Sequence, residues 1–409
     1  MGIKGLSKYL KQHAAHVMND WRGVDEFRGK PIAIDASPGL YTSLTTASSR
    51  PGDENDNSHV YGFLTRTIKM LELGLVPIWV FDGESPEMKT GTLSQREGVR
   101  NQARERLQEA REKGDSQAIQ KYAVRLVKAN QKHNDDVIEL LNLMGVPAVQ
   151  APSEAEALCV ALALAGRVEA VATEDMDALA FGAPLLLRFI NQAASSPKTS
   201  FLQRIQREEV LKGLRFSEEQ FLDFCILCGC DYLPTIQYVG PATAQRLMHQ
   251  HKSIEEILQH IDRKVNAVPE QWDYEKVRHW FRKPDVGDVQ SYNLERTAPN
   301  LHSLRDLLLE KHFLQEAMVE KYLARLDAVW RGEPPPQFAS DGKSTPAKTA
   351  AKKSSTCAPM ERGQRTLFQA FKPSSKAKAC STTVDSTEPP AKRPRVGEEP
   401  LRTESAAGA

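Results

Sequence analysis

The sequence lacks any apolar run long enough to cross a membrane and has almost no net charge. Its longest apolar stretch, ALCVALALAG, is about half of the roughly 18 to 20 residues that a membrane helix needs, and the first residues, MGIKGLSKYL, lack the apolar segment of a signal peptide. Basic and acidic residues nearly cancel, with 54 Lys+Arg against 53 Asp+Glu. We therefore expect a soluble protein that recognises its partners through local patches of charge.

Cysteine is also scarce, with six residues in a chain of 409. Three of them, Cys225, Cys228 and Cys230, stand close together, so a zinc site is one alternative. Their segment, EEQFLDFCILCGCDY, has the apolar spacing of a buried helix, and no second Cys/His pair follows at the spacing of a zinc finger. We expect reduced, buried cysteines in an intracellular protein.

Proline and charge are distributed unevenly along the chain. Residues 333–409 hold ten of the 24 prolines and 13 Lys+Arg against 8 Asp+Glu, whereas the first 332 residues have 41 against 45. This C-terminal stretch is rich in Ser, Thr, Lys and Ala and has too few apolar residues to bury a core. We expect a folded, slightly acidic body followed by a disordered, basic tail.

Short apolar runs alternate with helical patterns through the body. Strands are predicted within residues 30–35, 76–81, 146–151, 168–173 and 184–190, and helices within 61–74 and 153–166. This alternation is typical of an α/β fold with a mostly parallel central sheet.

Between Lys89 and Lys132 the pattern changes to long, charged helical sequence with regularly spaced basic residues. The expected basic stripes consist of Arg96, Arg100 and Arg104, then Lys121, Arg125, Lys128 and Lys132. A solvated pair of surface helices is the alternative interpretation.

Seven acidic residues follow the ends of apolar runs along two hundred residues of sequence. They are Asp35, Asp82, Glu154, Glu156, Asp175, Asp177 and Asp231. Because successive parallel strands end at the same edge of a sheet, we expect these carboxylates to converge there. Seven negative charges in one crevice repel one another, and two hard dications with oxygen ligands are the ordinary way to neutralise them. Two-ion sites promote in-line phosphoryl displacement, so hydrolysis of a phosphodiester is the expected reaction.

Each acid taken singly has a structural alternative. Asp82 precedes a glycine in a common turn, Ser153 and Glu156 have the spacing of a capping box, and Asp175 can cap a helix. Asp231 is different, because it follows a predicted helix C-terminus, where the macrodipole disfavours an anion unless a cation lies beside it. Taken together, the seven acids favour one shared site.

The motifs MGIKGL, AIDAS, VFDG, KHND, APSEAEA, ATEDMDALAFG, GCDY, VGPATA and HKSIEEI occur in this order. They resemble the flap endonuclease branch of the XPG nuclease family over about residues 1–330. The resemblance implies a PIN-like or resolvase-like nuclease core with a helical arch and a helix-two-turn-helix element. The implied divisions are an N-terminal nuclease region (1–104), the rest of the arch (105–121), an internal nuclease region with the helix-two-turn-helix (122–253), a C-terminal helical region (254–332) and the tail (333–409).

The resemblance also implies a function. It is a structure-specific 5′ flap endonuclease with 5′–3′ exonuclease activity, which acts in Okazaki-fragment maturation and long-patch base-excision repair. Two alternatives stay open: another nuclease of the family that acts on junctions or bubbles, and a non-catalytic scaffold that binds DNA structures.

By the same resemblance, the seven acids hold two Mg²⁺ ions, with Asp35, Asp82, Glu154 and Glu156 at the first and Asp175, Asp177 and Asp231 at the second. Lys89 and Arg96 are implied to act on the scissile phosphate. Tyr41 matches an aromatic that stacks on a terminal base, with a place at the edge of the core as the alternative. Further DNA contacts are implied for Arg66, Arg100, Arg125, Lys128, Glu154, Gly229, Asp231 and Gly240.

The chain departs from the family pattern at several positions. In the helix-two-turn-helix, where the resemblance implies a K⁺ ion, Tyr238 adds a side chain in place of a glycine and Ala242 removes a lysine. In the arch, Val99 and Val124 occupy places that are often basic, which predicts weaker and less salt-dependent phosphate steering.

The tail contains two short motifs. Residues 364–371, QRTLFQAF, resemble the box Q-x-x-L-x-x-F-F that binds the sliding clamp PCNA, with Gln364, Leu367 and Phe371 in place and Ala370 replacing one aromatic anchor. We expect clamp binding of reduced affinity. The run AKRPR at 391–395 resembles a nuclear import signal. The expected location is the nucleus, including the nucleolus, with mitochondria as a second site, and the expected state is a monomer apart from the clamp.

Overall fold

The computed structural model describes residues 2–47, 57–195, 201–334 and 336. These residues belong to one compact unit, Met1–Ser340. Within the described ranges, no helix combines the length and the apolar character needed to span a bilayer. The predicted tail motifs at 364–371 and 391–395 lie outside the described residues, and the division of the body into four regions stays a prediction.

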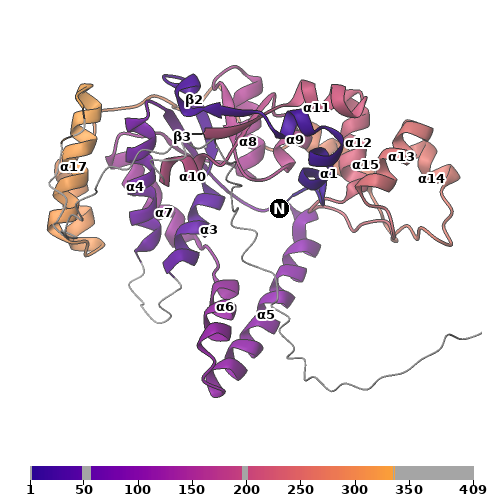
Figure 1. Cartoon of the computed structure of the whole chain (residues 1–409), viewed down its shortest axis with the longest axis horizontal. Coiled ribbons are helices and arrows are strands. Elements are labelled where there is room, and N and C mark those ends of the chain that lie inside the picture. Colours follow the sequence, from indigo (N-terminus) through magenta and orange to yellow (C-terminus); the bar gives the residue numbers. More distant parts are fainter. Residues whose placement is uncertain (1, 48–56, 196–200, 335, 337–409) are drawn as a thin grey trace, which may run out of the picture. The chain divides into compact units, whose positions relative to one another are not determined.

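A central sheet of seven strands organises the described residues, in the order β1-β7-β6-β5-β2-β3-β4 (Figure 1). The strands are β1 (Trp21–Gly23), β2 (Pro31–Asp35), β3 (Val76–Phe81), β4 (Ala148–Gln150), β5 (Ala170–Ala172), β6 (Leu185–Arg188) and β7 (Phe201–Gln206). Neighbours from β6 through β5, β2 and β3 to β4 are parallel, and β7 is antiparallel to both β6 and β1. The predicted α/β class with a mostly parallel sheet is confirmed.

The five parallel strands are the five that the sequence predicts, whereas β1 and β7 were missed. β1 has three residues, too few for a periodic pattern, and β7 (FLQRIQ) interleaves polar and apolar residues without strict alternation. The sequence signal was strongest for strands that are buried on both faces, because such strands read as continuous apolar runs.

Both faces of the sheet are covered. Successive residues of β2 enter different cores, with Ile32 and Ile34 on one face and Ala33 on the other. The Ala33 side packs against α1 (Leu6–His13), α2 (Ala15–Met18), α8 (Ala155–Leu164), α9 (Asp177–Phe181), α11 (Arg207–Leu214), α12 (Glu218–Cys228), α13 (Pro241–His251), α14 (Ile254–His260) and α15 (Tyr274–Arg282). The Ile32 side packs against α3 (Ala36–Ala47), α4 (Ser58–Glu72), α7 (Gln131–Leu143), α10 (Ile190–Ser195), α16 (Leu301–Asp306) and α17 (Glu316–Arg331).

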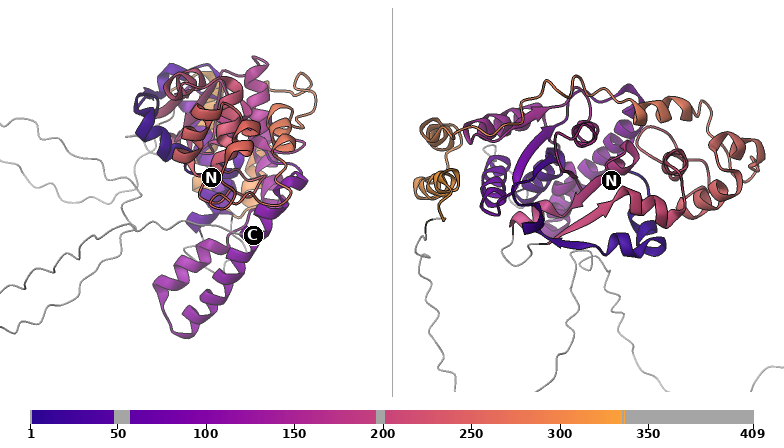
Figure 2. Two further views of the ribbon diagram at one scale, coloured as in Figure 1. Left: turned by 90° about the vertical axis from the view of Figure 1, so that its right-hand side faces the viewer. Right: turned by 90° about the horizontal axis from the view of Figure 1, so that it is seen from above.

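Two further helices, α5 (Thr90–Glu112) and α6 (Ser116–Leu126), pack against each other and project away from the sheet (Figures 1 and 2). In α5 only Ala103, Leu107 and Ala110 are buried, and α6 buries no residue fully. The two helices therefore form a largely solvated hairpin, which begins directly after the short helix η2 (Glu87–Lys89).

The predicted second basic stripe is not one helical face. Because α6 ends at Leu126, Lys128 lies in the connection to α7, and Lys132 belongs to the first turn of α7. Lys121 and Arg125 remain on α6, where both cations lie over the ring of Tyr122.

The predicted cysteine environment is confirmed. Cys225 and Cys228 lie inside α12 and Cys230 just beyond it, and all three are buried and reduced. Burial also raises the pKa of each thiol, which keeps it protonated.

Candidate active site

The parallel strands deliver acidic residues to one edge of the sheet. Asp35 is the last residue of β2, Asp82 follows β3 and Asp175 follows β5. Because β5, β2 and β3 are adjacent and parallel, their C-terminal ends lie side by side.

The other four acids reach the same edge from helices. Glu154 is the N-cap residue of α8 and Glu156 lies in its first turn, after β4. Asp177 begins α9, and Asp231 follows the C-terminus of α12 by three residues.

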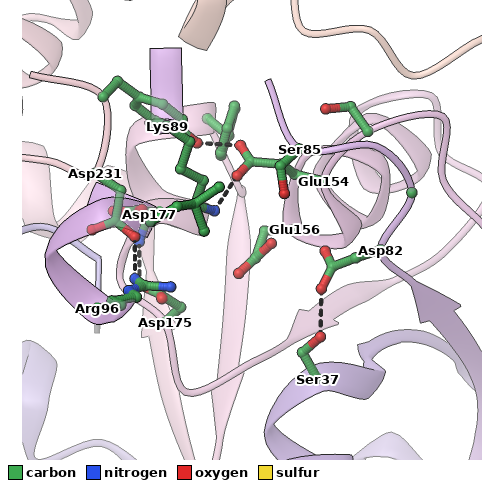
Figure 3. A pocket seen from close by; sticks show the side chains of 15 residues that line it. Ser37, Asp82, Ser85, Lys89, Arg96, Glu154, Glu156, Asp175, Asp177 and Asp231 are labelled. Carbon is green, nitrogen blue, oxygen red and sulfur yellow. Dashed lines mark hydrogen bonds and ion pairs between the residues drawn. The ribbon is translucent and has the colours of Figure 1, made fainter. Parts of the chain in front are cut away.

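A cavity of about 230 Å³ opens at this edge, and six of the seven predicted acids line it (Figure 3). They are Asp82, Glu154, Glu156, Asp175, Asp177 and Asp231. Figure 3 shows these side chains around one space, with Asp82 on one side of Glu156 and Asp175, Asp177 and Asp231 on the other. The predicted convergence of distant acids is what the structure shows for these side chains.

Asp35, the seventh acid, is buried beside the cavity, with 1% of its surface exposed. Its carboxyl accepts hydrogen bonds from the Ser37 amide and the Thr173 hydroxyl, both at 2.9 Å. Desolvation, followed by repulsion from Asp82, raises the pKa of Asp35 to about 8.

The same causes act on the acids around Asp35. Desolvation, then repulsion from Asp35 and Asp82, raises the pKa of Glu156 well above its usual value. Desolvation, then repulsion from Asp175 and Asp231, does the same for Asp177. An acidic cluster with raised pKa values is costly to the fold unless cations accompany it.

Two cations stand in the cavity wall. Lys89, at the end of η2, pairs with Glu154, and Arg96 on α5 pairs with Asp231 at 2.5 Å (Figure 3). Burial opposes the charge of Lys89, but the attraction of Glu154 and Glu156 outweighs it and raises the pKa of Lys89. Arg96 supplies the cation that Asp231 needs beyond the end of α12.

The structure adds polar side chains that the sequence interpretation had not singled out. The Tyr232 hydroxyl donates to one oxygen of Glu154 while Lys89 donates to the other. The Ser37 hydroxyl donates to Asp82 at 2.5 Å. Ser37 belongs to the AIDAS motif, and its place two residues after Asp35 is the feature of the sequence that could have identified it as a site residue.

The capping-box alternative for Ser153 and Glu156 is wrong. The Ser153 hydroxyl donates to the Glu84 carbonyl at 3.0 Å, and the N-cap residue of α8 is Glu154, whose side chain makes no cap. The first amide of the helix, that of Ala155, donates instead to Oδ1 of Asp82 at 2.9 Å. The turn after Asp82 does exist: a Cβ at Gly83 would lie 2.1 Å from the Ala151 carbonyl oxygen, so only glycine fits. This tight turn serves the site, because it directs Asp82 into the cavity.

The N-terminal segment closes one side of the acid cluster. Gly2 has φ +79°, and a Cβ there would lie 1.7 Å from Oδ1 of Asp175 and 2.6 Å from Oδ1 of Asp177. A residue with a side chain would therefore displace both carboxylates.

The donor set fits hard divalent cations. The cavity is lined by carboxylate oxygens, and the buried Oδ1 of Asp177 has no hydrogen-bond partner. In the positions that the side chains take here, no three His, Cys, Asp or Glu residues of the described ranges are grouped closely enough to hold one ion. Glu154 and Asp231 are instead turned toward Lys89 and Arg96.

The predicted DNA contacts on the helices lie in different environments. Tyr41 on α3 is 46% exposed, and its stacking on a terminal base stays a prediction beside the alternative of a place at the edge of the core. Arg66 is buried, and its guanidinium donates to the Gly39 carbonyl and the Ser43 hydroxyl at 3.0 and 2.7 Å. Burial lowers the pKa of Arg66 to about 10. In this position Arg66 fastens α3 to α4, and a direct contact with DNA stays a prediction.

The remaining predicted contacts lie nearer solvent or at helix ends. Arg100 pairs with Glu97 on α5. Gly229 is the C-cap of α12, with φ +101°, and its carbonyl accepts from the Lys4 amide at 2.9 Å. Gly240 is the N-cap of α13, and a Cβ there would meet nothing within 4 Å. Their roles in DNA binding stay predictions.

A mostly parallel α/β sheet with an acidic cavity at the C-terminal ends of its strands, flanked by two cations, defines a nuclease core. Family models match two parts of the chain: the XPG N-terminal domain at residues 1–103 and the XPG I-region at residues 145–231. The flap endonuclease 1 of Phytophthora infestans is 42% identical over 344 residues, which cover 80% of this chain and 88% of that protein. The chain belongs to the flap endonuclease branch of the XPG family.

Solved structures agree with this assignment. Flap endonuclease-1 from Methanococcus jannaschii matches with a TM-score of 0.58 and 29% identity, over 76% of this chain and 96% of that one. The catalytic core of Rad2 in complex with DNA substrate matches with a TM-score of 0.58 and 22% identity, over 78% of this chain and 98% of that one. The second similarity shows the shared fold.

Proposed function

We propose that this chain is a structure-specific endonuclease that hydrolyses a DNA phosphodiester at the base of a 5′ flap, with an accompanying 5′–3′ exonuclease activity. The observation that carries the proposal is the convergence of six carboxylates and two cations on one cavity. The names of the relatives, flap endonucleases, supply the substrate class.

We further propose that the site holds two Mg²⁺ ions. Asp82, Glu156, Asp175 and Asp177 line the cavity, with Asp35 buried beside it, and Glu154 and Asp231 become available when their cationic partners turn to a substrate. When bound, such ions lower the pKa of a coordinated water and offset charge on the attacked phosphate.

Lys89 and Arg96 have a defined part in this proposal. Both are paired with acids here, and a phosphodiester entering the cavity would compete for them. Lys89 stays charged throughout the neutral range because the acids raise its pKa. As water adds to phosphorus and an ester P–O bond breaks, negative charge builds on the phosphoryl oxygens, and two cations in the wall stabilise it.

The α5–α6 hairpin is the proposed route for the single strand. It starts at the cavity wall, since Arg96 lies in its second turn and Thr92 donates to the Asp231 carbonyl at 2.7 Å. Arg100, Arg125 and Lys128 are proposed to meet phosphates along it. Clamp binding through residues 364–371, a role in replication and repair, and a nuclear location are proposals that rest on the sequence alone.

The decisive experiment is a cleavage assay with the full chain. A 5′-labelled double-flap DNA is compared with bubble, four-way junction and nicked duplex, with Mg²⁺ or EDTA. We expect Mg²⁺-dependent cutting of the flap, and cutting of the bubble or junction in preference would favour the alternative branches of the family. Asp177→Ala should bind the flap and cut it at least about a hundredfold more slowly, while Glu295→Ala, which removes an exposed acid, should behave as the parent. Unchanged cutting by Asp177→Ala would contradict the site assignment.

A further inference from the structure

Tyr232 stands where the backbone is fixed on both sides. The carbonyl of Asp231, the residue before it, accepts a hydrogen bond from the Thr92 hydroxyl at 2.7 Å, and the carbonyl of Pro234 accepts one from the Trp272 indole at 2.9 Å. Only 5% of Tyr232 is exposed, although the residue lines the acidic cavity. The position of its side chain is therefore set by the surrounding fold.

The ring of Tyr232 is held by helix α15. Phe281 meets it nearly edge-on, with the ring centroids 5.2 Å apart and an interplanar angle of 82°, and the centroid of Trp280 lies 6.4 Å away. Such edge-to-face aromatic contacts are favourable and directional. Phe281 is itself buried and also packs against Phe181 at the end of α9, with the ring centroids 4.8 Å apart. This packing restricts the direction in which the Tyr232 hydroxyl points.

The hydroxyl points toward Glu154. It donates to one carboxylate oxygen of Glu154, while the Lys89 ammonium donates to the other. Glu154 is 4% exposed, so water has little access to either oxygen. Lys89 also lies over the ring of Tyr232, with its nitrogen 5.9 Å from the ring centroid. Three side chains from separate parts of the chain therefore form one unit in the cavity wall.

The two partners of Glu154 respond differently to a substrate. Lys89 is a cation on a flexible chain, and a phosphodiester in the cavity would compete with Glu154 for it. Tyr232 is neutral and packed, so a phosphate attracts it far less. When Lys89 turns away, Glu154 is a buried carboxylate with a hydroxyl as its partner, which is an unfavourable state unless another cation arrives. In that state the hydroxyl fixes one oxygen of Glu154 and leaves the other for the cation.

We propose that Tyr232 is a positioning residue for Mg²⁺: its hydroxyl holds one oxygen of Glu154 so that the other is available to the ion when Lys89 leaves. In this arrangement Tyr232 touches neither the ion nor the phosphate and acts through Glu154 alone. Hydrogen-bond partners of metal ligands typically change metal affinity or activity by roughly 10- to 100-fold. The inference rests on the proposed two-ion nuclease function and adds to the site a residue outside the seven acids.

The test is the Mg²⁺ dependence of thermal unfolding, with the full chain and without DNA. Tyr232→Phe removes the hydroxyl and keeps the ring that packs against α15. We expect the Mg²⁺ concentration that gives half of the maximal rise in Tm to be about tenfold higher for Tyr232→Phe than for the parent. Tyr9→Phe is the matched control, because Tyr9 is also 5% exposed and donates to a side chain, Gln245, but does not line the cavity. Its Mg²⁺ dependence should equal that of the parent.

A double-mutant cycle tests whether Tyr232 acts through Glu154. Glu154→Gln should itself weaken Mg²⁺ binding, and adding Tyr232→Phe to it should change the half-maximal concentration by less than about twofold. A general loss of packing would instead appear in both backgrounds. The proposal is overturned if Tyr232→Phe matches the parent or if its loss persists beside Glu154→Gln. It is also overturned if Tyr232→Phe shows no cooperative unfolding in EDTA, because Tyr232 would then be a residue of folding alone.

Cleavage provides a second readout. At saturating flap DNA, Tyr232→Phe should need about tenfold more Mg²⁺ for half-maximal cutting, and its kcat should come within about threefold of the parental value when Mg²⁺ is raised. A kcat that stays low at every Mg²⁺ concentration would contradict a role in ion binding.

Failure of this proposal is distinguishable from failure of the nuclease function. If the parent cuts flaps and Mg²⁺ raises its Tm, while Tyr232→Phe responds to Mg²⁺ like the parent, only the role of Tyr232 is lost. If the parent neither cuts DNA nor responds to Mg²⁺, the assignment of the cavity fails first.

Discussion

Replacing Asp35 by asparagine should stabilise the metal-free protein, and more so as the pH rises. Asp35 is buried, and desolvation together with Asp82 raises its pKa from 3.8 to about 8. At pH values between 3.8 and about 8, Asp35 keeps its proton in the folded state and releases it in the unfolded state. The unfolded state therefore binds fewer protons, and the free energy of unfolding falls as the pH increases from about 4 to about 8.

The size of the effect follows from those two pKa values. Between pH 5.5 and 8.0 the parent should lose about 3 kcal/mol of unfolding free energy through Asp35, at about 1.4 kcal/mol per pH unit with saturation near pH 8. The asparagine side chain of the Asp35→Asn variant does not titrate, so the variant should escape this loss. For a folded unit of this size the difference corresponds to about 6 °C in Tm.

Thermal unfolding in EDTA at pH 5.5 and 8.0 measures this difference directly. The Tm of Asp35→Asn minus that of the parent should grow by several degrees between the two pH values, and Glu295→Gln, at an exposed acid, should show no such growth. Saturating Mg²⁺ should raise the Tm of the parent more at pH 8.0 than at pH 5.5, because ions replace the retained protons. A Tm difference that is the same at both pH values would refute the reasoning.

Three further outcomes are expected. Arg96→Ala should slow flap cutting about a hundredfold or more at saturating DNA, because it removes one of the two cations that stabilise the transition state. The change also leaves Asp231 unpaired. In steady-state kinetics we expect a lower kcat with an unchanged KM, and an unchanged kcat would contradict the role of Arg96. Gly2→Ala should reduce cutting and the Mg²⁺-induced rise in Tm, because its Cβ would lie 1.7 Å from Asp175; a normal Mg²⁺ response would show that the N-terminal segment adapts. Phe371→Ala should weaken stimulation by the sliding clamp and leave clamp-free cutting intact, and equal stimulation of variant and parent would exclude the tail box.

Much of the site was accessible from sequence because its residues follow strands with a strong signal. Asp35 and Asp82 end apolar runs that are buried on both faces, and parallel strands bring such ends together whatever the intervening loops do. Asp231 was recognisable as a site residue since an anion beyond a helix C-terminus needs a cation. Arg96 supplies it from α5, 135 residues earlier in the chain.

The sequence by itself therefore determined the α/β class, the parallel strands and the set of acids that meet, because these depend on local periodicity and on where each run ends. Only the tertiary structure decided how the set is arranged. It buried Asp35 beside the cavity, turned Arg66 into a tie between two helices and held Tyr238 outward on a left-handed turn. These outcomes depend on contacts between segments far apart in the chain. Such contacts decide how strongly a side chain is desolvated and in which direction it points, and these two properties set its pKa and its access to a substrate.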